Sequence, residues 1–536
     1  MPIPLPTLLR RLRRSLASSI LTLTTCQALA LSPATLQTIA SGENDERIAA
    51  IVELAQGSDP QALTVLQALH NDALLLTPDG GVLLLRDGKA VDPLSGQASP
   101  LAPEQLEHAL LNNRIRRTLE AALAQLQLSH ADPAVRLAAV QALAEQNDET
   151  AMPQLKQRLD KETDTAVRVA LALAVARTEL QSPDAAVRAG AARTLGESAT
   201  PQIRSLLEAA TEKERDPQVA SELAASLREV KQRLFWAEVA GQLFTGVSLG
   251  SILLLAALGL AITYGLLGVI NMAHGEMLMI GAYCSYLVQS LFRSHLPAWQ
   301  EGYLLAALPV AFVVTGLLGV ALERLVIRHL YGRPLETLLA TWGISLVLMQ
   351  AVRLIFGAQN VEVANPGWLS GGWQVLPNLV LPYNRLAIIA FAGLVLLAVW
   401  AIINKTRMGL YVRAVTQHRP MAACVGVSTA KIDMLAFGLG SGIAGLAGVA
   451  LSQVGNVGPD LGQGYIVDSF MVVVLGGVGQ LAGTVLASLG LGMLAKLLEP
   501  QIGAVLAKIG ILLLIVLVIQ KRPMGLFALK GRMVER

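Results

Sequence analysis

The chain has 536 residues, of which 53% are hydrophobic and 15% are charged, and its formal net charge is +3. A mean hydropathy of +0.52 is too high for a soluble globular protein. Residues 236–536 hold 18 Lys and Arg against 11 Asp and Glu, which leaves 24 against 28 for residues 1–235. The basic residues of the second part lie at the ends of apolar segments and form no single stripe, so nucleic acid is excluded as a partner.

Residues 1–30 have the pattern of a signal peptide. Four arginines lie between positions 10 and 14, and an apolar stretch follows that ends in an A-x-A sequence at Ala30. We expect cleavage near Ala30, with an uncleaved anchor as the alternative. In either case the residues that follow should be exported.

Residues 31–235 are predicted to form a helical-repeat domain. Four segments share one pattern, at intervals of 32, 20 and 32 residues: DPAVRLAAVQAL from Asp132, DTAVRVALALAV from Asp164, DAAVRAGAARTL from Asp184 and DPQVASELAASL from Asp216. In each, Asp is suited to cap a helix and Val begins its buried stripe. The segments resemble HEAT-like repeats, and a packed Ala-rich bundle is the alternative. Residues 73–91 alternate apolar runs with Asp-Gly turns, which predicts a small β-hairpin or meander.

Residues 236–536 are predicted to be an all-α polytopic membrane domain, because apolar runs of about twenty residues follow one another. The expected spans are 241–263, 272–292, 303–323, 336–356, 386–404, 433–453, 467–478, 482–498 and 505–520. Two of them, 467–478 and 482–498, flank a Gly-rich stretch and are short. They are two tilted spans or one helix with a re-entrant piece, so the count is eight or nine.

The basic residues predict the orientation of these spans. Residues 328–333, 404–420 and 521–536 are basic, whereas 357–384 contain one charge, Glu362. The positive-inside rule places the first three segments in the cytoplasm and the last outside. A periplasmic N-terminal domain and a cytoplasmic C-terminus require an odd number of crossings, which favours nine or a re-entrant equivalent.

The sequence contains no pattern that indicates an enzyme. It has no P-loop for ATP, no set of residues spaced as metal ligands and no matched nucleophile and base. A G-x-G-x-x-G occurs at 440–445, but it lies inside an apolar span and follows no strand. Its small residues are predicted to let neighbouring helices approach closely.

The segment YGLLGVINMAHGEMLMIGAY (264–283) places Asn271, His274 and Glu276 where hydrocarbon penalises them. A carboxylate at the centre of a spanning helix costs about 2.5–3.5 kcal/mol on insertion scales, so such groups usually face a protein interior or a water-filled path. We expect them near helix breaks at Gly268 and Gly275, at a translocation path or gate. Glu276 is expected to be a buried, paired carboxylate that shapes the gate or a contact between subunits, with Asn271 and His274 lining it. The alternative is a cap that satisfies helix ends. On a regular helix His274 and Glu276 diverge, because they are two residues apart.

The basic segment TRMGLYVRAVTQHRPMAACVGV (406–427) predicts a short helix that opens at Pro420 and runs to Gly426. In a membrane protein without its own nucleotide site, such a helix suggests a docking surface for a separate ATPase. An ordinary basic loop that holds the orientation is the alternative.

These stretches, with VVVLGGVGQLAGTVLASLGLGML (472–494), resemble in order and spacing the permeases of the branched-chain amino-acid ABC importer family. The long N-terminal extension and the C-terminal end are most similar to the urea-transporter branch. The resemblance implies a second related permease, two cytoplasmic ATP-binding subunits and a periplasmic solute-binding protein, with ATP held by the partner subunits and no cofactor by this chain. It also implies a coupling helix that docks the ATPase, formed around Arg413, Thr416, Gln417, Arg419, Ala422, Ala423 and Gly426. ABC importers in general carry an E-A-A-x-x-x-G signature there, whereas this chain has Met421 in place of the Glu and one fewer residue before Gly426.

Transport of urea would require hydrogen-bonding groups along the path, such as Asn271, Thr341, Ser345 and Gln350. The expected function is therefore a permease subunit in the bacterial inner membrane that imports urea or a related short amide. Branched-chain amino acids are the alternative solute. A membrane-anchored periplasmic scaffold is a third reading.

Overall fold

The computed structural model describes residues 31–57, 61–86, 88–101, 106–146, 151–376, 378–523 and 525–527. The expected signal peptide at 1–30 lies outside the described residues. The chain divides into two compact units, Met1–Lys231 and Gln232–Arg536. We refer to them as the repeat unit and the membrane unit and describe each by itself.

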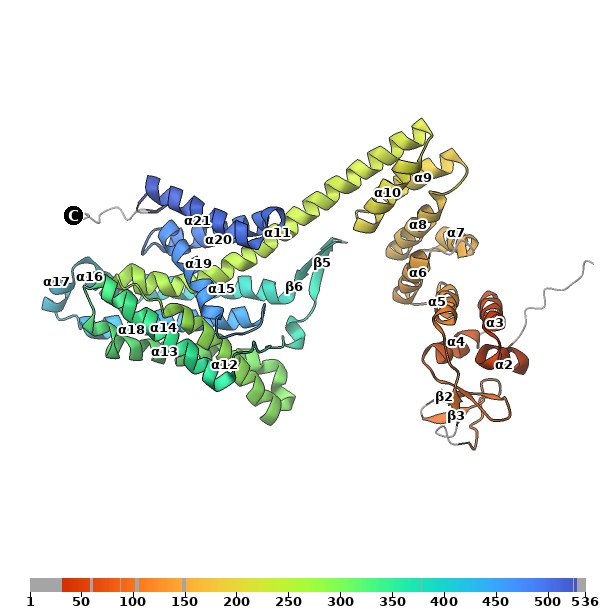
Figure 1. Ribbon diagram of the computed structural model, residues 1–536, viewed down its shortest axis with the longest axis horizontal. Helices are drawn as coiled ribbons and strands as arrows, with labels where there is room; N and C mark the ends of the chain where they lie inside the picture. Colours follow the sequence, from red (N-terminus) through yellow and green to blue (C-terminus); the bar gives the residue numbers. More distant parts are fainter. Residues whose placement is uncertain are drawn as a thin grey trace, which may run out of the picture. The chain divides into compact units, whose positions relative to one another are not determined.

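The repeat unit consists of helices and one small sheet (Figure 1). Its helices are α2 (Pro33–Ser41), α3 (Asn44–Gln56), α4 (Ala62–His70), α5 (Asn113–Gln127), α6 (Pro133–Gln146), α7 (Met152–Lys161), α8 (Thr165–Glu179), α9 (Ala185–Gly196), α10 (Pro201–Lys213) and the first part of α11 (Pro217–Leu267). The strands are β1 (Leu74–Leu76), β2 (Val82–Arg86), β3 (Lys89–Val91) and β4 (Glu107–His108). The predicted hairpin is thus part of an antiparallel sheet in the order β3-β2-β1-β4. A strand as short as β4 has no periodicity that the sequence could reveal.

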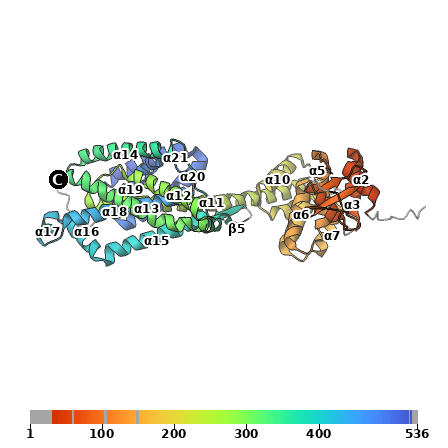
Figure 2. The same cartoon turned by 90° about the horizontal axis from the view of Figure 1, so that it is seen from below.

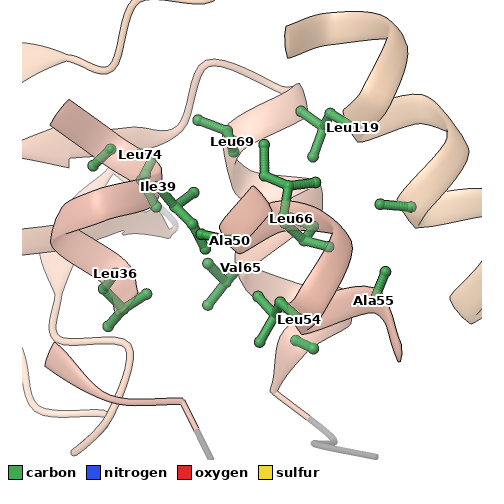
Figure 3. Close-up of a cluster of buried hydrophobic side chains, with 14 of the residues drawn as sticks. Leu36, Ile39, Ala50, Leu54, Ala55, Val65, Leu66, Leu69, Leu74 and Leu119 are labelled. Carbon is green, nitrogen blue, oxygen red and sulfur yellow. The ribbon is translucent and has the colours of Figure 1, made fainter. Parts of the chain in front are cut away.

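The N-terminal part of this unit has its own hydrophobic core. Aliphatic side chains from α2, α3, α4, β1 and α5 point toward one another in Figure 3, and Ile39, Leu66 and Leu119 in this cluster are fully buried. A second cluster forms from α5 to α8 around Leu143 and Leu171. The predicted all-α repeat architecture therefore begins with a mixed helix–sheet region.

The four aspartates predicted as helix caps do cap helices. Oδ1 of Asp132, Asp164, Asp184 and Asp216 accepts a backbone N–H two residues further on, at 2.8–2.9 Å. The capped helices are α6, α8, α9 and α11. These local predictions are confirmed because a cap depends only on residues that are adjacent in the sequence.

Two arginine–glutamate pairs show how the repeat is built. The Arg136 guanidinium donates to both carboxylate oxygens of Glu162, 26 residues later, at 2.9 and 2.8 Å. Arg188 makes the same bidentate contact with Glu214, again 26 residues later, at 2.8 and 3.0 Å. Each arginine also donates to two carbonyl groups just before its own helix. The alternating sequence intervals of 32 and 20 residues therefore arise from a repeat of three helices. The first copy is α6–α8 and the second is α9–α11.

The membrane unit is a bundle of long helices. It contains the rest of α11, then α12 (His274–His295), α13 (Tyr303–Leu325), α14 (Pro334–Phe356), α15 (Tyr383–Lys405), α16 (Arg407–Gln417), α17 (Arg419–Cys424), α18 (Thr429–Ser452), α19 (Leu461–Gly476), α20 (Leu481–Ile502) and α21 (Ala504–Lys521). Short 3₁₀ turns lie at Pro297–Gly302, Ile327–His329 and Gly367–Leu369, and β5 (Gly372–Leu376) pairs with β6 (Leu379–Pro382). Among the described residues, seven helices are long and apolar enough to cross a membrane. The nine expected spans lie on these seven and on α12 and α19, so the number of crossings stays a prediction.

Glycines set the closest helix crossings. Gly440 and Gly445 on α18 face Gly259 of α11 and Gly281 of α12, and Gly275 of α12 faces Gly462 of α19. A methyl group at Gly440 would lie 2.7 Å from the carbonyl oxygen of Gly259, closer than side-chain atoms approach. The glycine pattern at 440–445 is thus a packing surface in the middle of the bundle, as predicted.

The ends of the membrane unit differ in character. In Figures 1 and 2, α16 and α17 lie at one end and the β5–β6 hairpin lies at the other. The basic loop 328–333 is at the α17 end, because the guanidinium of Arg419 lies 4.7 Å from the ring centroid of Tyr331. The hairpin end exposes Trp368 and Trp373.

Candidate functional site

The first apolar helix ends close to the polar residues, as predicted. α11 ends at Leu267, Gly268 has a φ of +69°, and the chain resumes as α12 at His274. Only glycine adopts this conformation without strain. The second predicted break, at Gly275, is wrong: Gly275 is helical and packs against Gly462, where it permits a close helix contact.

Asn271 lies in this break and is fully buried. Its Oδ1 accepts the backbone N–H of Ala273 at 3.1 Å, which satisfies a donor just before α12. The N–H of Met272, one residue on, donates to Oγ1 of Thr341 on α14 at 3.1 Å. The break is therefore fixed to α14 by a hydrogen bond between residues far apart in the sequence.

His274 and Glu276 point to different helices. The imidazole Nε2 of His274 donates to the carbonyl oxygen of Ala256 on α11 at 3.0 Å. The carboxylate of Glu276 accepts a hydrogen bond from Oγ of Ser345 on α14 at 2.8 Å. Both residues are buried, and neither Nδ1 of His274 nor Oε2 of Glu276 has a hydrogen-bond partner among the described residues.

Four of the six predicted path residues lie together, and the other two lie elsewhere. Thr341 and Ser345 are buried on one face of α14, one turn apart, and contact the segment that carries Asn271 and Glu276. Gln350 is exposed on another face of α14 and does not join them. His274 packs on the opposite side, against Gly259.

Several charged residues of the membrane unit were not identified from the sequence. Arg353, near the end of α14, forms an ion pair of 2.5 Å with Asp460, which precedes α19. Glu323 and Asp433 are buried at the ends of α13 and α18. The sequence did not single them out, because charged residues are common at the ends of membrane spans.

The predicted ATPase-docking segment forms two helices, α16 and α17. Thr416 donates to the Val412 carbonyl of its own helix at 2.7 Å, and Arg413 donates to the Ile403 carbonyl of α15 at 2.8 Å. Gln417 and Ala423 are exposed, while Ala422 is buried against Val412, Val415 and Ile432.

The short helix α17 begins one residue before Pro420 and has defined ends. Its first turn is capped by His418, whose Nδ1 accepts the N–H of Met421 at 3.1 Å. Beyond its last turn, Gly426 has a φ of +89°, a left-handed conformation that ends helices and favours glycine. Arg419 forms an ion pair with Asp433 of α18. Met421, at the position of the family's Glu, is exposed.

No group of three or more His, Cys, Asp or Glu side chains within the described part of the chain could hold a metal ion. The polar groups that converge near the break are instead hydroxyls, an amide and one carboxyl. Such groups can exchange hydrogen bonds with a small polar solute.

The model of the family described as branched-chain amino acid transport system, permease component, matches residues 242–519. The chain belongs to this family. BraD, a high-affinity branched-chain amino acid transport system permease protein of Pseudomonas aeruginosa, is 31% identical over 291 residues, which are 53% of this chain and 94% of BraD. LivH of Escherichia coli K12, with the same description, is 31% identical over 295 residues, also 53% of this chain and 94% of LivH. The ribose import permease RbsC of Escherichia coli K12 is 32% identical over 109 residues, 19% of this chain and 34% of RbsC.

A model of HEAT repeats matches residues 108–176, in the repeat unit. No solved structure gives a significant match. The family-level resemblance is therefore confirmed for the membrane unit, and helical repeats of the HEAT type are supported for part of the repeat unit.

Proposed function

We propose that this chain is the permease subunit of an ABC importer that carries urea, or a related short amide, across the bacterial inner membrane. ATP is hydrolysed by separate subunits, and this chain is not itself an enzyme. Membership of the permease family supports the transport role, and so does the non-helical segment 268–273 between α11 and α12, which carries the buried Asn271. Inside a membrane domain, non-helical backbone is found where it is buried in protein or lines a cavity.

The chemistry of the buried polar groups favours urea. Around the break, Asn271, Thr341, Ser345 and Glu276 offer an amide, two hydroxyls and a carboxyl. In the described part of the membrane unit, no Lys or Arg is buried. Neutral urea needs only hydrogen bonds, which these groups can supply.

Branched-chain amino acids are the second candidate solute. BraD and LivH are described as branched-chain amino acid permeases, and this chain matches nearly the whole length of both proteins. The same architecture and coupling would serve either solute.

We place α16, α17 and the basic loop 328–333 in the cytoplasm and the β5–β6 hairpin outside. Their positions at opposite ends of the membrane unit support this orientation, together with the positive-inside rule. With nine crossings, the repeat unit is periplasmic and the C-terminus cytoplasmic, and lipid surrounds the apolar helices.

The proposed partners are a second related permease, two cytoplasmic ATP-binding subunits and a periplasmic solute-binding protein. α16 and α17 form the ATPase-docking surface in this proposal. The exposed side chains Met421 and Val425 support it, since they place apolar area on a surface that lies beyond the spans.

Uptake measurements test the function. Cells that lack the gene should lose uptake of labelled urea but keep uptake of labelled leucine, and the wild-type gene should restore urea uptake. Glu276→Gln should reduce urea uptake at least about tenfold at unchanged protein level, because the carboxyl is the strongest acceptor at the break. Loss of leucine uptake alone would assign the second solute. No change for either solute would contradict the permease role.

A further inference from the structure

Two buried carboxylates at the α17 end of the membrane unit play no part in the proposed solute path. Asp433 lies on the second turn of α18 and Glu323 on the last turn of α13, and both are nearly inaccessible to solvent. Oδ1 of Asp433 and Oε2 of Glu323 have no hydrogen-bond partner among the described residues. Burial of such charges is costly unless opposite charges or hydrogen bonds compensate them.

The compensation comes from α17 and from the loop that follows α13. The guanidinium of Arg419, the first residue of α17, forms an ion pair with the carboxylate of Asp433. The same guanidinium lies over the ring of Tyr331, 4.7 Å from its centroid, a favourable arrangement of a cation and an aromatic face. The Tyr331 hydroxyl in turn donates to Oε1 of Glu323 at 3.4 Å.

The guanidinium of Arg419 thereby joins α17 directly to α18, and to α13 through Tyr331. Its apolar contacts are small, since Ala422 is the buried residue of α17 in the cluster with Val412, Val415 and Ile432. A six-residue helix with one buried alanine has little apolar area to fix its direction. The charged contacts of Arg419 therefore set how α17 is held against α18.

α18 runs from this contact toward residues 268–273, the break between α11 and α12. Seven residues after Asp433, Gly440 packs against Gly259 of α11, and Gly259 in turn packs against the imidazole of His274. His274 opens α12 and donates to α11. A rigid helix with backbone-to-backbone contacts on both sides transmits a displacement of its first turn to residues 268–274.

We propose that Arg419 and Asp433 are positioning residues that fix α17 to α18, so that movement of the ATPase-docking surface reaches the break at 268–273. Tyr331 and Glu323 extend this contact to α13. The inference rests on the proposed function in one respect, namely that α17 receives an ATPase. The contact between α17 and α18 is a property of the chain alone.

The first test measures that contact in the full-length purified chain without partners. Amide hydrogen exchange in residues 419–427 should be at least about tenfold faster in Asp433→Asn and Arg419→Gln than in wild type. Arg419→Lys, which keeps the charge but loses the planar group over Tyr331, should lie between wild type and Arg419→Gln. Asp468→Asn is the matched control, because Asp468 forms an ion pair with Lys508 of α21, away from α17. Unchanged exchange in both Asp433→Asn and Arg419→Gln would overturn the proposal.

The second test measures coupling in the importer reconstituted with its ATP-binding and solute-binding subunits. In Asp433→Asn, uptake per ATP hydrolysed should fall at least about tenfold while the ATP-binding subunits stay bound. Asp468→Asn should retain the wild-type ratio. If uptake and hydrolysis fall in proportion, the pair only stabilises the fold and the proposal is wrong.

The two tests separate this inference from the proposed function. Uptake by the wild-type importer reports on the function, and the exchange experiment needs no transport. Should Arg419→Gln fail to fold because it leaves the buried Asp433 without a partner, Asp433→Asn remains informative, since Arg419 is half-exposed and can be solvated.

Discussion

The carboxylate of Glu276 depends on a single hydroxyl. Ser345 donates to it at 2.8 Å from α14, and its second oxygen has no hydrogen-bond partner among the described residues. Ser345→Ala would leave both oxygens buried without a partner, a change that costs about 1–3 kcal/mol. We therefore expect a clearly lower melting temperature for the purified Ser345→Ala chain.

Ser285→Ala is the matched control for this substitution. Ser285 is a buried serine of α12 whose Oγ has no hydrogen-bond partner among the described residues. Removing that hydroxyl breaks no described bond, so the melting temperature should change little or rise slightly. Equal decreases in the two variants would show that the Ser345–Glu276 bond contributes nothing specific.

At the scale of the helical elements, the two Arg–Glu pairs of the repeat unit make its stability depend on pH. The bonds from Arg136 lower the pKa of Glu162 from 4.5 to about 2, and those from Arg188 do the same for Glu214. The folded state therefore binds fewer protons than the unfolded state between these values. The stabilisation is complete above pH 4.5 and is lost as the pH falls toward 2.

Glu162→Gln should remove part of this dependence. At pH 7 the melting temperature of the repeat unit should fall by roughly 5–10 °C, because the variant breaks a bidentate contact with a buried arginine. As the pH approaches 2 the variant and wild type should converge, since the wild-type carboxylate then loses its charge as well. Thermal unfolding followed by far-UV circular dichroism measures both values. Glu208→Gln, which affects an exposed pair with Lys231, should change little at either pH, and an equal effect would contradict the argument.

These elements also show which features a sequence can predict. The caps at Asp132 and Asp164 and the glycine surface of α18 were predictable, because each depends on residues close together in the chain. Asn271 and Glu276 were identified as buried because hydrocarbon excludes them. Their hydrogen-bond partners were not predicted. The hydrogen bond from Ser345 to Glu276 spans 69 residues, and the sequence does not indicate which face of α14 turns inward.

The charged contacts at the α17 end were missed for the same reason. Asp433 and Glu323 lay at the limits of predicted spans, where a charge is unremarkable. Only the folded bundle brings Asp433, Tyr331 and Arg419 together from three segments. The fourth strand of the sheet, β4, was not predicted, because it has only two residues.

At the scale of the whole molecule, the two units have separate hydrophobic cores. The buried clusters around Leu66 and Leu171 contain residues of the repeat unit alone, and those around Leu255 and Tyr283 contain residues of the membrane unit alone. A membrane unit with its own core and glycine crossings should fold without the repeats. The repeat unit is therefore available for a separate role, and helical repeats commonly present extended surfaces to partners.

We expect the repeat unit to bind the solute-binding protein or the partner permease from the periplasmic side. Deletion of residues 31–230 should leave the membrane unit inserted and bound to the ATP-binding subunits, while uptake falls at least about tenfold because solute is delivered less efficiently. Copurification, solute-stimulated ATP hydrolysis and uptake should be measured on the same preparation. Restoration of uptake by a large excess of solute-binding protein would identify that protein as the partner, whereas persistent loss with intact assembly would point to the second permease. Unchanged uptake and assembly after the deletion would contradict both, and the repeats would then have no part in transport.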